Sequence, residues 1–118
     1  MKVIHVITDL DIGGAEMMLY KLLASLRNNE IESLVITLMG RGKITERIEA
    51  LGVKVETLDL EQGARPSWNT IKKLKRIVRI SNPDIIQGWM YHGNIAATVA
   101  VFLFDPMRRK VKLFWNVR

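Results

Sequence analysis

A glycine-containing loop at residues 9–14 follows the first apolar run and leads directly into a helical pattern. Gly13 and Gly14 let the backbone approach a ligand closely, and the amides and dipole at a helix start favour a phosphate group. Glu16 stands in the first helical turn, where a carboxylate either interacts favourably with the dipole or contacts a substrate. On spacing alone, the two glycines are equally compatible with a simple tight turn between a strand and a helix.

A second loop, at residues 88–94, contains His92 with glycines on either side, together with Tyr91 and Asn94. A histidine beyond the end of a parallel strand can donate a hydrogen bond to a substrate or take part in proton transfer. Tyr91 and Asn94 are further candidate substrate contacts. The alternative is that His92 packs at the start of a helix beneath the loop. His5, inside the first apolar run, is expected to be a packed core residue.

Five apolar runs alternate with four helical patterns along the chain. The predicted strands cover residues 2–8, 32–39, 53–58, 84–89 and 111–115, and the predicted helices cover residues 15–28, 43–51, 67–80 and 91–104, with Gly52 capping the second. This alternation predicts one α/β domain with a parallel, Rossmann-like sheet in three layers. Ligands bind such sheets beyond the carboxyl ends of the strands, where both loops lie.

The third predicted helix, residues 67–80, separates an apolar stripe from a basic face. The residues expected to face inward are Trp68, Ile71, Leu74, Ile77 and Val78. The opposite face carries Lys72, Lys73, Lys75 and Arg76. A basic amphipathic helix of this kind can lie on an anionic membrane. The alternative is the solvated outer face of an ordinary Rossmann helix.

The charge of the chain is unevenly distributed. Residues 1–59 carry seven basic and nine acidic side chains, whereas residues 60–118 carry eleven and three, for a net charge of +6. This asymmetry indicates an anionic partner, with phosphate, lipid headgroups and nucleic acid all open on charge alone. The absence of cysteine excludes a disulfide framework and a thiolate metal site, and favours a cytoplasmic location. No apolar stretch approaches the roughly 20 residues of a membrane-spanning helix.

Other phosphate-binding classes fit less well. A dinucleotide dehydrogenase needs Gly-x-Gly-x-x-Gly after the first strand and an acidic residue ending the second, and neither is present. A receiver-like regulatory module remains the alternative, because Asp9 and Asp11 follow the first strand and Asp59 follows the third. Against it, the fourth strand ends in Gly-Trp and no lysine follows the fifth. Nucleic-acid binding is not expected, because the residues between the basic positions are aliphatic and form no stacking platform.

Three segments together resemble the amino-terminal domain of family 4 glycosyltransferases of the GT-B type. The family's first strand, glycine loop and first helix are similar to VIHVITDLDIGGAEMMLYKLLASL, in which Gly-Gly-Ala-Glu is the most specific part. Its fourth strand and following helix are similar to NPDIIQGWMYHGNIAATVA, and its fifth strand is similar to VKLFWNVR. The resemblance implies a partial acceptor-side domain over residues 1–118, with the carboxy-terminal donor-binding domain absent.

The resemblance also implies a retaining enzyme of glycan biosynthesis at the cell envelope. It would transfer a sugar from a nucleotide-sugar to a glycan, lipid or small-molecule acceptor. Gly13 and Gly14 would meet the donor phosphates, His92 would lie beside the transferred sugar, and Arg118 would reach acceptor or donor phosphate. No metal and no cofactor other than the nucleotide-sugar co-substrate is expected, since the family is usually metal-independent.

Three expectations concern the chain as given. The 118 residues by themselves are expected to be inactive as a transferase. Their location is expected to be cytoplasmic, with peripheral contact at the inner membrane face. The sheet is expected to have an exposed edge after the fifth strand, which invites self-association.

Overall fold

A computed structural model of the chain describes residues 1–8, 14–26, 31–59, 68–89, 98–99 and 112–116. Its five strands are β1 (Lys2–Ile7), β2 (Glu32–Thr37), β3 (Lys54–Thr57), β4 (Ile85–Trp89) and β5 (Lys112–Asn116). They form one sheet in the order β3-β2-β1-β4-β5, and every neighbouring pair is parallel. The predicted α/β class and parallel Rossmann-like sheet are confirmed.

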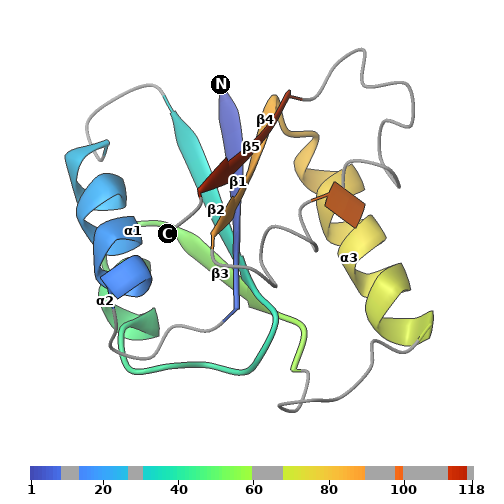
Figure 1. The fold of residues 1–118 in the computed structure, drawn as a ribbon, viewed down its shortest axis with the longest axis horizontal. Coiled ribbons are helices and arrows are strands. Elements are labelled where there is room, and N and C mark those ends of the chain that lie inside the picture. Colours follow the sequence, from blue (N-terminus) through green and yellow to red (C-terminus); the bar gives the residue numbers. More distant parts are fainter. Residues whose placement is uncertain (9–13, 27–30, 60–67, 90–97, 100–111, 117–118) are drawn as a thin grey trace.

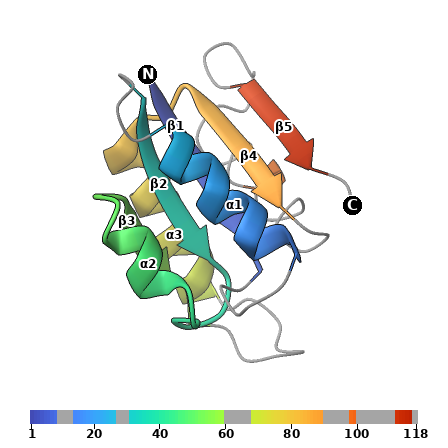
Figure 2. The same ribbon diagram turned by 90° about the vertical axis from the view of Figure 1, so that its left-hand side faces the viewer.

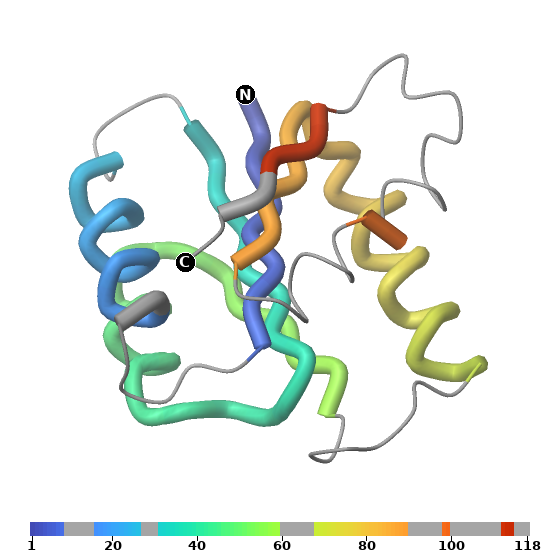
Figure 3. The backbone as a smooth tube through the Cα atoms, in the orientation of Figure 1, coloured from blue at the N-terminus to red at the C-terminus, as the bar shows by residue number. Residues whose placement is uncertain are grey.

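Helices cover both faces of this sheet, as Figures 1 and 2 show. The helices α1 (Gly14–Ser25) and α2 (Thr45–Glu49) lie on one face, and α3 (Trp68–Ser81) lies on the other. The tube in Figure 3 shows the same arrangement, with α3 on the side of the sheet opposite α1 and α2. Of the predicted helix 91–104, only the helical residues Thr98 and Val99 lie within the described part of the chain. Among the described residues, no helix combines the length and apolarity that crossing a membrane requires.

Strand β1 is buried on both sides, because its alternate side chains feed two separate cores. Ile4 and Val6 join the core beneath α3, which includes Ile77 and Val78. Ile7 joins the core beneath α1 and α2, which includes Leu19, Leu23, Ile44 and Ile48. His5 is 1% exposed, so the prediction that it is a core residue is confirmed.

The inward face of α3 was predicted correctly except at its first residue. Leu74, Ile77 and Val78 are buried and Ile71 is half-buried, but Trp68 is 68% exposed. The expectation that Trp68 packs inward is therefore wrong. At about 100° per residue, Trp68 lies roughly 120° around the helix axis from Leu74, which is too far to reach the sheet. The exposed indole stands at the start of the basic face.

The outer strands of the described sheet are β3 and β5. The placement of β5 at one edge agrees with the expected edge after the fifth strand, and its Phe114 is exposed. Parallel pairing puts Phe114 in one row with Gln87 and His5, on the α1 side of the sheet. Self-association through this edge stays a prediction.

Gly52 follows α2 with a positive φ of 87°, two residues beyond the helix cap at Ala50. Its amide donates to the carbonyl of Glu49, closing the turn that leads into β3. A residue with a Cβ would be strained in this left-handed backbone conformation, which explains why glycine stands here.

We expect Gly52→Ala to lower the free energy of unfolding by about 1–2 kcal/mol, the usual cost of left-handed backbone for a residue with a Cβ. Crowding does not contribute, because an added Cβ meets nothing within 4 Å. Urea denaturation would measure the loss. Gly40→Ala is the matched control, since its Cβ would lie 3.5 Å from Oδ1 of Asp59, an ordinary contact. Equal losses in the two variants would contradict the backbone explanation.

Candidate functional site

The strand order reverses between β1 and β4. The chain moves outward from β1 through β2 to β3, and then returns through α3 to place β4 on the other side of β1. Ile7 at the end of β1 lies in register with Trp89 at the end of β4. The chain therefore leaves these two strands at neighbouring points of the sheet edge. In open parallel sheets, this switch point is where ligands bind.

The predicted site residues fall mostly in those two loops. Gly14 is the first residue of α1. Gly13, the segment containing Tyr91, His92 and Asn94, and the terminal Arg118 lie outside the described residues. The topology brings the starts of the two loops together, and the roles assigned to these side chains stay predictions.

Glu16 is buried in the first turn of α1, with only 4% of its surface exposed. A carboxylate at this position is stabilised by the amides and dipole of the helix start. Its side chain is therefore largely shielded from solvent. A direct substrate contact by Glu16 stays a prediction.

Thr8 is a polar residue at the switch point that the sequence did not single out. It directly follows β1, and its carbonyl accepts a hydrogen bond from the amide of Met39 at 3.1 Å. Its Oγ1 is buried, and the described residues provide no hydrogen-bond partner for it. A buried hydroxyl normally has a partner, so this oxygen is available to the adjoining loops or to a ligand.

A buried hydrogen bond joins the two strands just below the switch point. The indole Nε1 of Trp89 donates to Nδ1 of His5 at 3.1 Å, and both side chains are almost fully buried. Their ring centroids are 6.1 Å apart and the ring planes are tilted by 51°. Because Nδ1 accepts this bond, the neutral imidazole carries its proton on Nε2. Trp89 is thereby held three residues before His92.

Burial lowers the pKa of His5 to about 4, because the charged imidazolium loses its hydration in the core. Nε2 is buried with no hydrogen-bond partner among the described residues. His5 is therefore neutral at physiological pH. Its hydrogen bond inside the core makes it a positioning group for Trp89.

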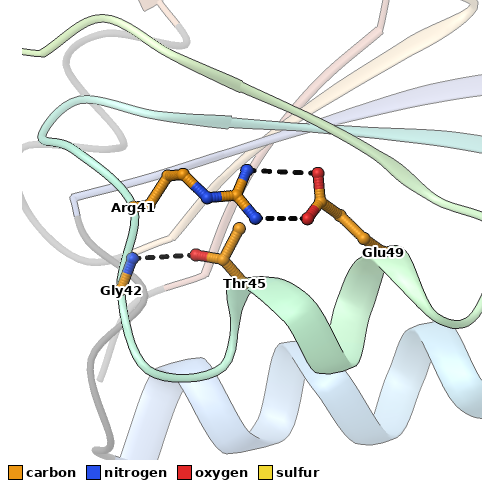
Figure 4. Close-up of polar contacts among 4 residues, drawn as sticks. All are labelled: Arg41, Gly42, Thr45 and Glu49. Atoms are coloured by element: carbon orange, nitrogen blue, oxygen red, sulfur yellow. Dashed lines mark hydrogen bonds and ion pairs between the residues drawn. The ribbon is translucent and has the colours of Figure 1, made fainter.

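The loop after β2 is closed by its own side chains, as Figure 4 shows. The guanidinium of Arg41 pairs in bidentate fashion with the carboxylate of Glu49 on α2, which lowers the pKa of Glu49. The amide of Gly42 donates to Oγ1 of Thr45 at 2.8 Å. These contacts direct Arg41 towards α2 and away from a free phosphate-binding role.

The receiver-like alternative depends on three aspartates. Asp59 follows β3 with a φ of 55° and is exposed. Asp9 and Asp11 lie outside the described residues. Within the part of the chain that the structure describes, no three His, Cys, Asp or Glu side chains gather as a metal site would require.

The four basic residues predicted to face a membrane do not behave alike. Lys72, Lys75 and Arg76 are exposed on α3, but Lys73 is half-buried. The ammonium group of Lys73 donates to the carbonyl of Thr57 at the end of β3. Lys73 therefore fastens α3 to the sheet, and it does not belong to the free basic face.

Comparisons with known proteins support the family and the fold. The family model Glycosyltransferase Family 4 matches residues 12–117. No curated protein matches the chain. Among solved structures, GalB, the 4-carboxy-2-hydroxymuconate hydratase from Pseudomonas putida KT2440, superposes with a TM-score of 0.58 at 16% identity. The superposition covers 94% of this chain and 62% of GalB, so this chain spans less than two thirds of that protein. The likeness to GalB concerns the fold alone.

We expect acid to destabilise the chain through His5. Its pKa is about 4 in the folded state against an ordinary value of 6.5, so the unfolded state binds more protons between these values. This contribution to stability is complete above the ordinary pKa and is lost as the pH falls towards the folded one. Between about pH 7 and about pH 5, the free energy of unfolding should fall by about 2 kcal/mol from this group.

His5→Gln is the matched variant, because it removes the titrating group and retains an acceptor for the indole of Trp89. Urea denaturation of both proteins at the two pH values isolates the contribution of His5 from that of the carboxylates. The variant should lose about 2 kcal/mol less than the parent protein. The same loss in both would show that His5 does not titrate as its burial requires.

Proposed function

Because the chain belongs to Glycosyltransferase Family 4, we propose that it is the acceptor-side domain of a retaining glycosyltransferase that uses a nucleotide-sugar donor. The observation that carries this proposal is the family match over residues 12–117, which includes Gly13 and Gly14 at the end of the first loop and the whole of the second loop. A second Rossmann-like domain, outside these 118 residues, binds most of the donor across a cleft.

The phosphate-binding part of the proposal is supported by the start of α1. This helix begins at Gly14 and points its amino-terminal end to the carboxyl edge of the sheet. Transfer of the sugar builds negative charge on the departing diphosphate. Loop amides from Gly13 and Gly14, together with the helix dipole, stabilise that charge in the transition state.

The sugar-binding part is supported by the end of β4. Trp89 is fixed by its buried hydrogen bond to His5, so the segment that follows leaves the sheet from a constrained position. His92, three residues later, contacts the hydroxyls of the transferred sugar and orients its reacting carbon. Tyr91, Asn94 and Arg118 contribute further contacts to donor or acceptor.

The substrates are a nucleotide-sugar and a glycan or lipid acceptor, and the reaction needs no cofactor besides the donor. The site of action is the cytoplasmic side of a membrane where such acceptors are made. The family assignment favours this function over the receiver-like alternative.

The 118-residue chain alone should give negligible transfer or hydrolysis of nucleotide-sugars, because one wall of the cleft is missing. A panel of UDP- and GDP-linked sugars, with release of the nucleoside diphosphate as the readout, tests this. The enzyme that contains residues 1–118 together with a donor-binding domain is the positive control. Turnover by the chain alone at the rate of that enzyme would overturn the two-domain proposal.

In the two-domain enzyme, His92→Ala should lower kcat by about a hundredfold or more, the usual contribution of a positioned histidine. Lys54→Ala, at the amino end of β3, is the control and should retain kcat, since its side chain pairs with Glu56 far from the switch point. Anomeric configuration of the product, followed by NMR, tests retention. Unchanged kcat in His92→Ala would remove His92 from the site.

A further inference from the structure

The outer face of α3 is a cationic surface with no acidic residue along the helix. Lys72, Lys75, Arg76 and Arg79 are exposed there, and the ion pairs between described residues involve other side chains. The helices on the opposite face of the sheet differ, because α1 and α2 together carry three acidic and two basic residues. We call the side chains of Lys72, Lys75, Arg76 and Arg79 the α3 cationic face.

Two large apolar side chains accompany this face. Trp68 is 68% exposed at the start of α3, and Ile80 is 75% exposed near its end. The ammonium group of Lys72 lies 6.0 Å from the centroid of the Trp68 ring. Trp68, Lys72, Lys75 and Arg79 follow one another at helical spacing, so they form a single stripe along the helix.

The helix cannot turn this face inward. Its other side is committed to the core through Leu74, Ile77 and Val78, and Lys73 is bonded to the end of β3. A membrane-bound amphipathic helix normally buries its apolar stripe in lipid, and that mode is unavailable here. Any partner of α3 must bind the cationic face as it stands, with Trp68 and Ile80 as its apolar contacts.

We propose that the α3 cationic face and Trp68 form a docking surface for an anionic lipid membrane. Charge complementarity is the first argument, since each basic residue near an anionic bilayer adds to the attraction. The second is the exposed indole, a group that favours the boundary between lipid headgroups and acyl chains. A nucleic acid would pair with the cations but would leave Ile80 uncovered and would find only one stacking residue on α3.

The orientation of α3 gives this docking a consequence. Trp68 lies at the end of α3 nearest the carboxyl ends of the strands, where the chain enters from β3 (Figure 1). Lys73 is bonded to the last residue of β3, which fixes that end of the helix at the same edge. A bilayer on this surface would lie beside the switch point and would present a lipid-linked acceptor to it. This consequence rests on the proposed function, whereas the docking itself does not.

Vesicle flotation tests the docking with the 118-residue chain, using phosphatidylcholine vesicles with and without phosphatidylglycerol. The chain should bind only the anionic vesicles. Lys72/Lys75/Arg79→Gln should weaken binding by about a hundredfold, as expected for three lost cations near the bilayer. The matched control is Lys21/Lys43/Arg47→Gln, which removes the same three charges from exposed positions on the α1 and α2 side. This control should bind nearly as well as the parent.

Trp68→Ala separates the apolar contribution from charge. It should weaken binding by about tenfold, and that factor should persist in high salt, where the contribution of the cations is screened. Circular dichroism confirms that each variant is folded. Absence of parent binding to anionic vesicles, equal losses in the two triple variants, or tighter binding to duplex DNA or an acidic polypeptide would each overturn the proposal. Flotation reads binding alone, so its failure is distinguishable from failure of the transferase assay.

Discussion

Burial of β1 on both faces is the constraint from which the rest of the architecture follows. Its side chains enter two cores, one with α1 and α2 and the other with α3, so helices must cover both sides of the sheet. Because helices cover both faces of the sheet, a ligand can reach the backbone of the strands only at their ends. The reversal of strand order beside β1 opens space at the carboxyl ends of β1 and β4. The burial of β1 therefore determines where the candidate site lies.

The indole of Trp89 and the imidazole of His5 form a hydrogen bond within the core. Among the described residues, it is the one buried hydrogen bond between two side chains, and it joins β1 to β4. Burying an indole N–H or an imidazole nitrogen without a partner costs free energy. Here the indole N–H and Nδ1 of the imidazole satisfy each other's hydrogen-bonding capacity. Hydrophobic packing alone would tolerate several orientations of a tryptophan at this position. The hydrogen bond selects one, and the chain leaves β4 towards His92 from that fixed point.

The sequence predicted most of the fold because apolar runs and helical spacing are local signals. The five strands, the end of α3 before Asn82 and the turn at Gly52 all follow from residues close together in the chain. Trp68 was misassigned because a helical pattern does not say how far the sheet extends under the first turn. The pairing of His5 with Trp89 spans 84 residues and depends on strand register. The burial of the Thr8 hydroxyl and the bond from Lys73 to Thr57 are likewise set by tertiary contacts. The loops at the switch point were located by topology, whereas the roles of their residues came from the family.

One side of α3 packs on the sheet and the other side carries exposed basic residues, so packing in the core determines the composition of the surface. The residues that face the sheet fix the axis and rotation of the helix, and this rotation alone decides which cations stay free. Lys73 is drawn to β3, while Lys72, Lys75 and Arg79 remain in line with Trp68. The helix that carries the cationic face is thus fixed against the core. Because it lies on one face of the sheet and the switch point lies at the strand ends, charge on α3 and chemistry in the loops can change independently. The proposed lipid-docking surface and the proposed donor site therefore share no residues.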